Sequence, residues 1–284
     1  MLNIEEIKKI FRDEDLKILK SLGQNFLIDK TVLDKIIGAS DLDKNDAVIE
    51  IGPGLGVLTR ELSTRCGKII AIEKDKKMAE MLINKVSSFQ FPVSSTEIIN
   101  DDILKINLDK LLKKYAPGGK YKLVSNIPYY ITSPIIKLFL ETEIKPEIIV
   151  LLVQKEVAER ICAGPRKLSI LALSVQIYGE PSIVSYVDKS AFYPEPKVDS
   201  AILKIKNIKN SAASRAPENN KNLFRIIKIG FSSKRKKLLN NLSAGLNISK
   251  KETAEILLKA NINLNARAQE LRLEDWEKLE EMVW

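Results

Sequence analysis

The sequence contains no histidine, and this absence restricts the chemistry open to the chain. Histidine is the commonest general base near neutral pH and a frequent zinc ligand. Its absence excludes histidine-ligated metal sites and disfavours hydrolases that use a catalytic triad. We therefore expect no metal site.

Cysteines and long apolar runs are also scarce. Cys66 and Cys162 lie far apart and lack metal-ligand spacing, so we expect two small buried side chains in a reducing compartment. No apolar run approaches the roughly 18 residues of a membrane span. Residues 1–20 mix acids and bases, unlike a signal peptide. These features predict a cytoplasmic protein without a membrane partner.

Positive charge is in excess. The 284 residues include 46 Lys and Arg against 37 Asp and Glu, which gives a formal net charge of +9. Such an excess favours a polyanionic partner such as nucleic acid. The length predicts about two domains.

A glycine-rich turn follows the first expected strand. The strand is Ala47–Ile51, the turn is Gly52-Pro53-Gly54-Leu55-Gly56, and a helix follows at Val57–Leu62. This order is typical of the first crossover of a nucleotide-binding α/β fold, because glycines let a ligand approach the backbone. The spacing differs from the Gly-x-Gly-x-x-Gly of dinucleotide-binding proteins, which argues against NAD.

Acidic residues end the next two expected strands. Glu73 follows Lys68–Ile72, where a carboxylate can accept hydrogen bonds from both hydroxyls of a ribose. Asp101 and Asp102 follow Thr96–Ile99, where one can accept from the amine of an adenine and the other can cap the next helix. A surface carboxylate without a ligand is the alternative for Glu73.

An amide, a proline and an aromatic ring follow the fourth expected strand, Tyr121–Val124. Pro128 fixes its own φ and restricts Ile127, so this loop is stiff. Asn126, the backbone carbonyls and the Tyr129 ring can together hold a planar base that bears an exocyclic amine. The alternative is an ordinary turn in which Asn126 bonds its own backbone.

Two more loops have a distinctive composition. Gly23–Asp29 ends a helix expected over residues 1–22, and Asp29 can cap a helix at Lys30–Ile37. Two prolines stiffen Phe192-Tyr193-Pro194-Glu195-Pro196, so its rings can form a wall of a base pocket or pack in the core.

The C-terminal part of the chain has only helical patterns. Alternating strands and helices run to residue 206, a Ser- and Asn-rich linker spans 207–220, and helices follow over 221–284. A basic run is densest at Lys234, Arg235, Lys236 and Lys237, which we place in a helix over 234–242. This one-sided run favours contacts with a phosphate backbone over a merely solvated face.

The order of these motifs resembles that of S-adenosylmethionine-dependent class I methyltransferases. Within them the sequence is most similar to the family of ribosomal RNA small-subunit adenine N6,N6-dimethyltransferases. The most specific segments are Asn-Ile-Pro-Tyr-Tyr-Ile-Thr-Ser-Pro (126–134) and Phe-x-Pro-x-Pro-Lys-Val-Asp-Ser (192–200). The resemblance implies a Rossmann-like α/β domain with a mostly parallel sheet at 1–206 and a small all-α RNA-binding domain at 221–284. The loop at Cys162–Lys167 is shorter than the family usually has.

The resemblance also implies the roles of individual residues. Contacts to S-adenosylmethionine are implied for Asn25, Leu27, Gly52, Glu73, Asp102 and Asn126. A clamp on the target adenine is implied for Asn126, Pro128 and Tyr129, with Phe192 on the other face of the base.

The implied activity is dimethylation of the N6 amines of two adjacent adenosines near the 3′ end of 16S rRNA in the small ribosomal subunit. We expect a monomer that takes part in ribosome biogenesis. The main alternative is an RNA-binding assembly factor with little dependence on catalysis. A DNA adenine methylase and an NAD-dependent dehydrogenase are further alternatives.

Overall fold

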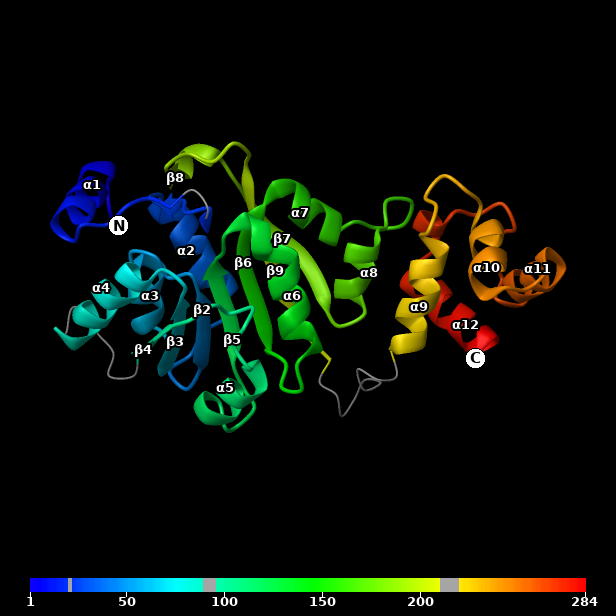
Figure 1. The fold of residues 1–284 in the computed structure, drawn as a ribbon, viewed down its shortest axis with the longest axis horizontal. Coiled ribbons are helices and arrows are strands. Elements are labelled where there is room, and N and C mark those ends of the chain that lie inside the picture. The colour runs from blue at the N-terminus through cyan, green and yellow to red at the C-terminus, as the bar shows by residue number, and fades with distance from the viewer. Residues whose placement is uncertain (20–21, 89–95, 210–219) are drawn as a thin grey trace. The chain divides into compact units, whose positions relative to one another are not determined.

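The structure is a computed structural model, and it describes residues 1–19, 22–88, 96–209 and 220–284 (Figure 1). The helices and strands follow one another along the chain in this order: α1 (Ile4–Asp13), β1 (Phe26–Leu27), α2 (Lys30–Ala39), β2 (Ala47–Ile51), α3 (Val57–Ser63), β3 (Lys68–Glu73), α4 (Lys76–Ser87), β4 (Thr96–Asn100), α5 (Leu108–Tyr115), β5 (Lys122–Asn126), η2 (Tyr129–Ile131), α6 (Thr132–Glu141), β6 (Ile148–Gln154), α7 (Lys155–Ile161), α8 (Ile170–Gln176), β7 (Glu180–Val187), η3 (Lys189–Ala191), β8 (Phe192–Tyr193), β9 (Ser200–Lys206), α9 (Lys221–Gly230), α10 (Leu238–Leu246), α11 (Lys250–Lys259), η4 (Ala268–Glu270) and α12 (Leu273–Val283).

A seven-stranded sheet in the order β4-β3-β2-β5-β6-β9-β7 forms the centre of the fold. Neighbouring strands from β4 to β6 are parallel, whereas β9 is antiparallel to both β6 and β7. The inner strands are almost wholly apolar, as β6 illustrates, because helices lie on both faces of the sheet (Figure 1). The predicted α/β fold with a mostly parallel sheet is therefore confirmed.

The strand order reverses at β2. The chain adds β3 and β4 on one side of β2 and then returns to add β5 on the other side. Ligands of open α/β sheets bind at such a switch point, beyond the carboxyl ends of the strands. The Ser125 hydroxyl oxygen accepts a hydrogen bond from the Ile51 N–H at 2.7 Å, which ties the ends of β2 and β5 together.

A second, two-stranded sheet joins the two loops that the sequence analysis singled out. β1 pairs antiparallel with β8, so that Phe26 lies opposite Tyr193 and Leu27 opposite Phe192. Ile28 extends this pairing through a hydrogen bond from its N–H to the carbonyl of Ala191 at 2.8 Å. The Gly23–Asp29 loop is thereby held beside a segment that lies about 165 residues later in the chain. Neither strand was predicted.

The N-terminal helix is shorter than the sequence suggested. α1 ends at Asp13, whereas a helix was predicted over residues 1–22. Asp15 has a positive φ of 45°, which a helix does not allow. This turn lets Leu16 pack with Met78 and Leu82 of α4 in an apolar cluster.

The chain divides into two compact units. The first comprises Met1–Ala158 and Glu180–Ile208, and the second comprises Glu159–Gly179 and Lys209–Trp284. The second unit thus contains α8, which the predicted boundary at residue 206 assigned to the first. α8 belongs there because it packs on α9, and the Tyr178 ring lies 6.4 Å from the Phe224 ring. Residues 210–219 of the predicted linker lie outside the described residues.

The basic run forms a turn rather than a helix. α10 begins only at Leu238, so the prediction of a helix over 234–242 was wrong for its first four residues. The buried Asn241 amide donates to the carbonyl oxygens of Gly230 at 2.6 Å and Ser233 at 3.0 Å. These bonds fix the turn between α9 and α10.

Candidate active site

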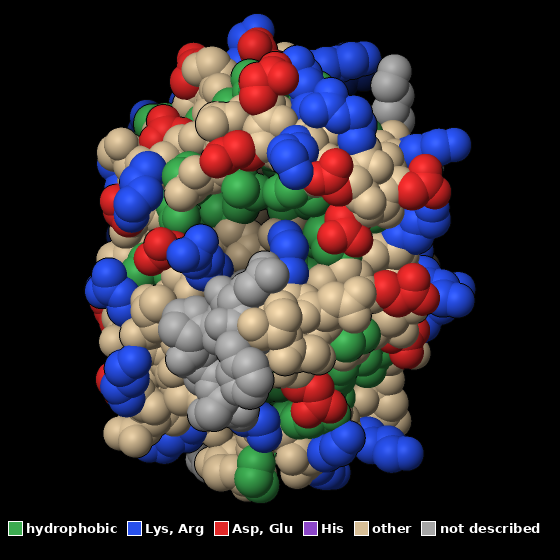
Figure 2. Space-filling view, turned by 90° about the vertical axis from the view of Figure 1, so that its left-hand side faces the viewer, with side chains coloured by type: hydrophobic (Ala, Val, Ile, Leu, Met, Phe, Trp, Pro, Cys, Tyr) green, Lys and Arg blue, Asp and Glu red, His purple; other side chains and the backbone are tan. Residues whose placement is uncertain are grey.

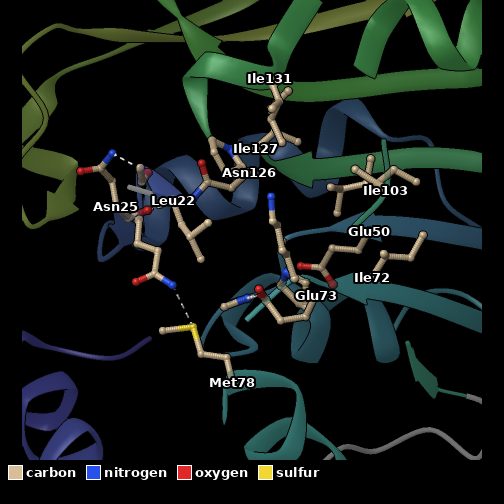
Figure 3. Close-up of a pocket in the computed structure, with 18 of the residues that line it drawn as sticks. Leu22, Asn25, Glu50, Ile72, Glu73, Met78, Ile103, Asn126, Ile127 and Ile131 are labelled. Atoms are coloured by element: carbon tan, nitrogen blue, oxygen red, sulfur yellow. Dashed lines mark hydrogen bonds between the residues drawn. The ribbon is translucent and has the colours of Figure 1, made fainter. Parts of the chain in front are cut away.

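One pocket lies at the carboxyl ends of β2, β3, β4 and β5, where the strand order reverses. We call it the switch-point pocket. Its empty space is about 1150 Å³, including the part open to solvent, which is the scale of a small-molecule site. All six residues predicted to contact a cofactor line it, as Figure 3 shows for several of them: Asn25, Leu27, Gly52, Glu73, Asp102 and Asn126.

The glycine turn brings bare backbone to the pocket wall. Gly52, Gly54 and Gly56 have φ values of 64°, 56° and 80°, a region that residues with a side chain rarely adopt. A Cβ on Gly54 would lie 3.2 Å from the Phe26 ring, so the two segments pack with no space for a side chain. The turn and β1 therefore adjoin in the wall of the pocket.

Glu73 ends β3 inside the pocket and is 5% exposed. One carboxylate oxygen accepts from the Asp75 N–H at 2.8 Å and the other from the Gly54 N–H at 3.1 Å. Burial raises the pKa of Glu73 above its ordinary value, and these two N–H groups oppose the rise. Each oxygen keeps a second lone pair, so the carboxylate can still accept from hydroxyl groups of a ligand.

Glu50 is a pocket residue that the predicted site lacked. It lies inside β2 and is 1% exposed, and its Oε2 has no hydrogen-bond partner among the described residues. Burial is the main cause that raises the pKa of Glu50, to about 8, and the nearby charge of Glu73 adds to it. Figure 3 shows both glutamates at the pocket. An acid within an apolar strand, two residues before the first glycine, was the signal in the sequence.

Asp102 lies in the loop after β4 and is already engaged by the protein. Its Oδ1 accepts from the Leu104 N–H at 3.1 Å, and its Oδ2 lies 3.0 Å from the Lys74 ammonium. Partial burial raises the pKa of Asp102, but the bonds from Lys74 and Leu104 outweigh it and the net shift is downward. Neither aspartate caps the next helix, because Asn107 caps α5.

Asn126 ends β5, and its side chain bonds a distant segment instead of its own backbone. The amide nitrogen donates to the carbonyl oxygen of Asn25 at 3.3 Å. Because the NH₂ group is used in this way, the amide oxygen remains as an acceptor for a ligand. The alternative of an ordinary self-bonded turn does not describe this loop.

Tyr129 and Pro128 continue the pocket wall beyond Asn126. The Tyr129 hydroxyl lies 2.6 Å from the Ser200 hydroxyl of β9, which fixes the edge of the ring. Burial raises the pKa of Tyr129, and the Ser200 hydroxyl opposes this. The Pro128 carbonyl accepts from the Ile131 N–H at 3.2 Å and keeps one lone pair.

A family model described as ribosomal RNA adenine dimethylase matches residues 16–283. The chain belongs to this family. A relative called ribosomal RNA small subunit methyltransferase A, from Dehalococcoides mccartyi, is 44% identical over 274 residues, which cover 96% of this chain and 91% of the relative. A relative of the same name from Clostridioides difficile is 37% identical and covers 97% and 94%.

Two solved structures support the assignment of the chain to this family. A dimethyladenosine transferase from Plasmodium falciparum superposes with a TM-score of 0.75 at 27% identity, over 89% of this chain and 95% of that one. The 23S rRNA methyltransferase ErmE superposes with a TM-score of 0.68 at 27% identity, over 91% and 99%. The dimethylase is thus an rRNA adenine methyltransferase with a class I methyltransferase fold.

Phe192 of the dimethylase does not lie on the pocket wall. It is 3% exposed and packs in the apolar core with Leu27, its partner across the two-stranded sheet. The pairing of β8 with β1 places this ring in the core, and the contact of Phe192 with the target base stays a prediction. Tyr130, which was not predicted as a site residue, lines the pocket and is 56% exposed.

The basic residues from Lys234 to Lys237 are exposed in the second unit. The Lys237 ammonium donates to the Asn265 side chain at 2.6 Å.

On the face seen in Figure 2, acidic and basic side chains are interspersed, and hydrophobic side chains border a hollow. Across the described residues there is no cluster of metal-ligating side chains, and no helix there has the length and apolar character to cross a bilayer.

Proposed function

We propose that this dimethylase transfers methyl groups from S-adenosylmethionine to the N6 amines of two adjacent adenosines near the 3′ end of 16S rRNA. One observation carries the proposal. The amide nitrogen of Asn126 bonds Asn25, which leaves the amide oxygen available as an acceptor in a residue that lines the pocket together with Tyr129. The names of the relatives favour the small ribosomal subunit as substrate. We further propose that the protein acts as a cytoplasmic monomer.

The polar groups of the switch-point pocket fit S-adenosylmethionine, which supplies an activated methyl group when it is bound. The Glu73 carboxylate can accept from ribose hydroxyls, and the Asp102 carboxylate can accept from the adenine amine. Glu50 is neutral near pH 7 without a ligand, and a cationic group of the ligand beside its unpartnered oxygen would favour the ionised form. Gly52 lets the ligand approach the backbone, and Asn25 and Leu27 also line the pocket.

The clamp residues address the weak nucleophilicity of an adenine amine, whose lone pair is delocalised into the ring. The Asn126 oxygen and the Pro128 carbonyl can accept the two N–H bonds and favour a more tetrahedral nitrogen. The Tyr129 ring can stack on the base, and the Ser200 hydroxyl holds that ring in place. Orientation in a desolvated site then contributes more than a base would, and the released proton passes to water because the chain has no histidine.

The target adenosine has to leave its stack to reach the clamp. We propose that the Lys234–Lys237 turn contacts the RNA backbone while the base is held. We propose that Phe192, which lies opposite Leu27 across the two-stranded sheet, contacts the other face of the base.

A competition experiment tests the substrate. The protein is given labelled S-adenosylmethionine with unmethylated small subunits, large subunits or duplex DNA. Transfer confined to the small subunit is expected. Preferred transfer to the large subunit would favour the activity named for ErmE, and preferred transfer to DNA would favour a DNA methylase. Tight binding to the small subunit without transfer would favour the assembly-factor alternative.

A further inference from the structure

Lys74 lies in the wall of the switch-point pocket, directly after Glu73. Its ammonium is 3.0 Å from Oδ2 of Asp102, and the two side chains are 51% and 17% exposed. The backbone at this point is tied to the end of β4, because Asn100 and Asp101 both donate to the Glu73 carbonyl, at 2.9 and 3.1 Å. The backbone is thus fixed, whereas the half-exposed lysine side chain is held at its end by the ion pair and has space for other rotamers.

Both oxygens of the Asp102 carboxylate have a protein partner. The Leu104 N–H on Oδ1 belongs to the turn after β4 and cannot leave without rebuilding that turn. The Lys74 ammonium on Oδ2 can leave by rotation of its side chain. Under the proposed function Asp102 must also accept a hydrogen bond from an adenine amine. Each oxygen keeps one lone pair, as in Glu73, so the competition is for the space at the carboxylate. Lys74 and Asp102 both line the pocket, and Lys74 is the partner that can move.

We propose that the Lys74 ammonium occupies the side of Asp102 to which the adenine amine of the cofactor binds. Lys74 therefore lowers the affinity for adenine. It also weakens the discrimination between an amine and an oxo group at position 6 of the purine. This role rests on the proposed function. An ammonium beside Asp102 can also donate to a 6-oxo group, which a carboxylate alone would repel. Removal of the lysine charge should therefore strengthen the binding of an adenine ligand and not that of a hypoxanthine ligand.

Calorimetric titration of the full chain with S-adenosylhomocysteine tests this competition. Lys74→Met keeps the apolar stem and removes the charge. We expect binding about threefold tighter than for the unmodified protein at low salt, the scale of a partly exposed ion pair. The difference should shrink as salt screens the pair. Lys76→Met is the matched control, because Lys76 is 80% exposed, pairs with Glu80 at 3.8 Å and does not line the pocket. The control should bind as the unmodified protein does.

A second titration with S-inosylhomocysteine distinguishes competition for Asp102 from simple covering of the pocket by the Lys74 side chain. This ligand has a 6-oxo group in place of the amine, so Lys74→Met should leave its affinity unchanged or reduce it. Equal tightening for both ligands would mean that Lys74 only covers the pocket, and the competition would be refuted. Unchanged or weaker binding of S-adenosylhomocysteine to Lys74→Met would refute it as well. If the unmodified protein does not bind S-adenosylhomocysteine, the proposed function is overturned, and the proposed role of Lys74 is overturned with it.

Discussion

The side-chain amide nitrogen of Asn126 lies 3.3 Å from the backbone carbonyl oxygen of Asn25. This bond joins the end of β5 to the loop before β1, which are about 100 residues apart in the chain. It also engages the nitrogen of the amide and leaves the oxygen as the acceptor. The orientation of the acceptor therefore depends on the N-terminal loop as well as on β5.

Replacement of Asn126 by alanine should abolish methyl transfer. The variant loses the acceptor for the target amine, and we expect a decrease in kcat of at least about 100-fold, as for the loss of a preorganised polar group in other enzymes. Binding of the small subunit, measured by filter retention, should remain close to that of the unmodified protein. Asn84→Ala, at an exposed position of α4, is the control. Turnover that survives in Asn126→Ala would contradict the assignment of the clamp.

The ring and the hydroxyl of Tyr129 should contribute differently. Tyr129→Phe removes the 2.6 Å bond to Ser200 but keeps the ring, so we expect a loss of a few fold in kcat/KM, and Ser200→Ala should match it. Tyr129→Ala also removes the stacking surface, which is worth about 1–3 kcal/mol per base. Its loss in kcat/KM should therefore be about 5- to 150-fold larger. Equal effects of the phenylalanine and alanine variants would argue against stacking.

Glu50 should make the stability of the ligand-free protein depend on pH. Its pKa is raised to about 8 from 4.5, so the folded state binds a proton that the unfolded state has released between these values. The contribution of Glu50 to the free energy of unfolding is therefore fully present below about pH 4.5 and is lost as the pH rises towards 8. Denaturant unfolding of Glu50→Gln should give a stability advantage over the unmodified protein that grows across this range, by up to a few kcal/mol. An advantage that is constant from pH 5 to pH 8 would contradict a neutral buried Glu50.

The Lys234–Lys237 turn should carry part of the salt dependence of RNA binding. Substitution of its four basic residues by glutamine should weaken binding of the small subunit and reduce the slope of log K against log salt, by about one for each lost phosphate contact. Glutamine at Lys250, Lys251, Lys259 and Lys278 removes the same charge from other exposed positions of the second unit and is the control. The same slope for both variants would show that the turn is only a solvated face.

Gly230 should not tolerate a side chain. A Cβ there would lie 2.3 Å from the ring of the fully buried Trp276, and the Gly230 carbonyl accepts the bond from Asn241 that fixes the basic turn. We expect Gly230→Ala to lower the free energy of unfolding by about 1–3 kcal/mol, the usual cost of overpacking. Gly164→Ala, where a Cβ meets nothing within 4 Å, is the control. Equal midpoints of thermal unfolding for the two variants would contradict this packing.

Residues whose position follows from strand ends were the ones that sequence reasoning located best. Glu73 and Asn126 end their strands in the sequence pattern, and parallel strands bring those ends to one edge. Phe192 could not be placed in this way, because its direction is set by the pairing of β8 with β1, which no local pattern reveals. The contact of Lys74 with Asp102 was missed for a similar reason, since it depends on the reach of one side chain between neighbouring strands.

Helix ends were also hard to predict. The basic run consists of good helix formers, yet Asn241 holds it as a turn through two backbone carbonyls. α1 stops at Asp13 because burial of Leu16 outweighs the continued helical pattern. Tertiary contacts decided both cases.

Transfer of labelled methyl from S-adenosylmethionine to unmethylated small ribosomal subunits, followed by nucleoside analysis of the RNA, tests the central claim most directly. We expect the label in N6,N6-dimethyladenosine, at two adjacent positions near the 3′ end of 16S rRNA, and no label with Asn126→Ala. Absence of dimethyladenosine, while the subunit is still bound, would contradict the proposed function and favour an assembly factor.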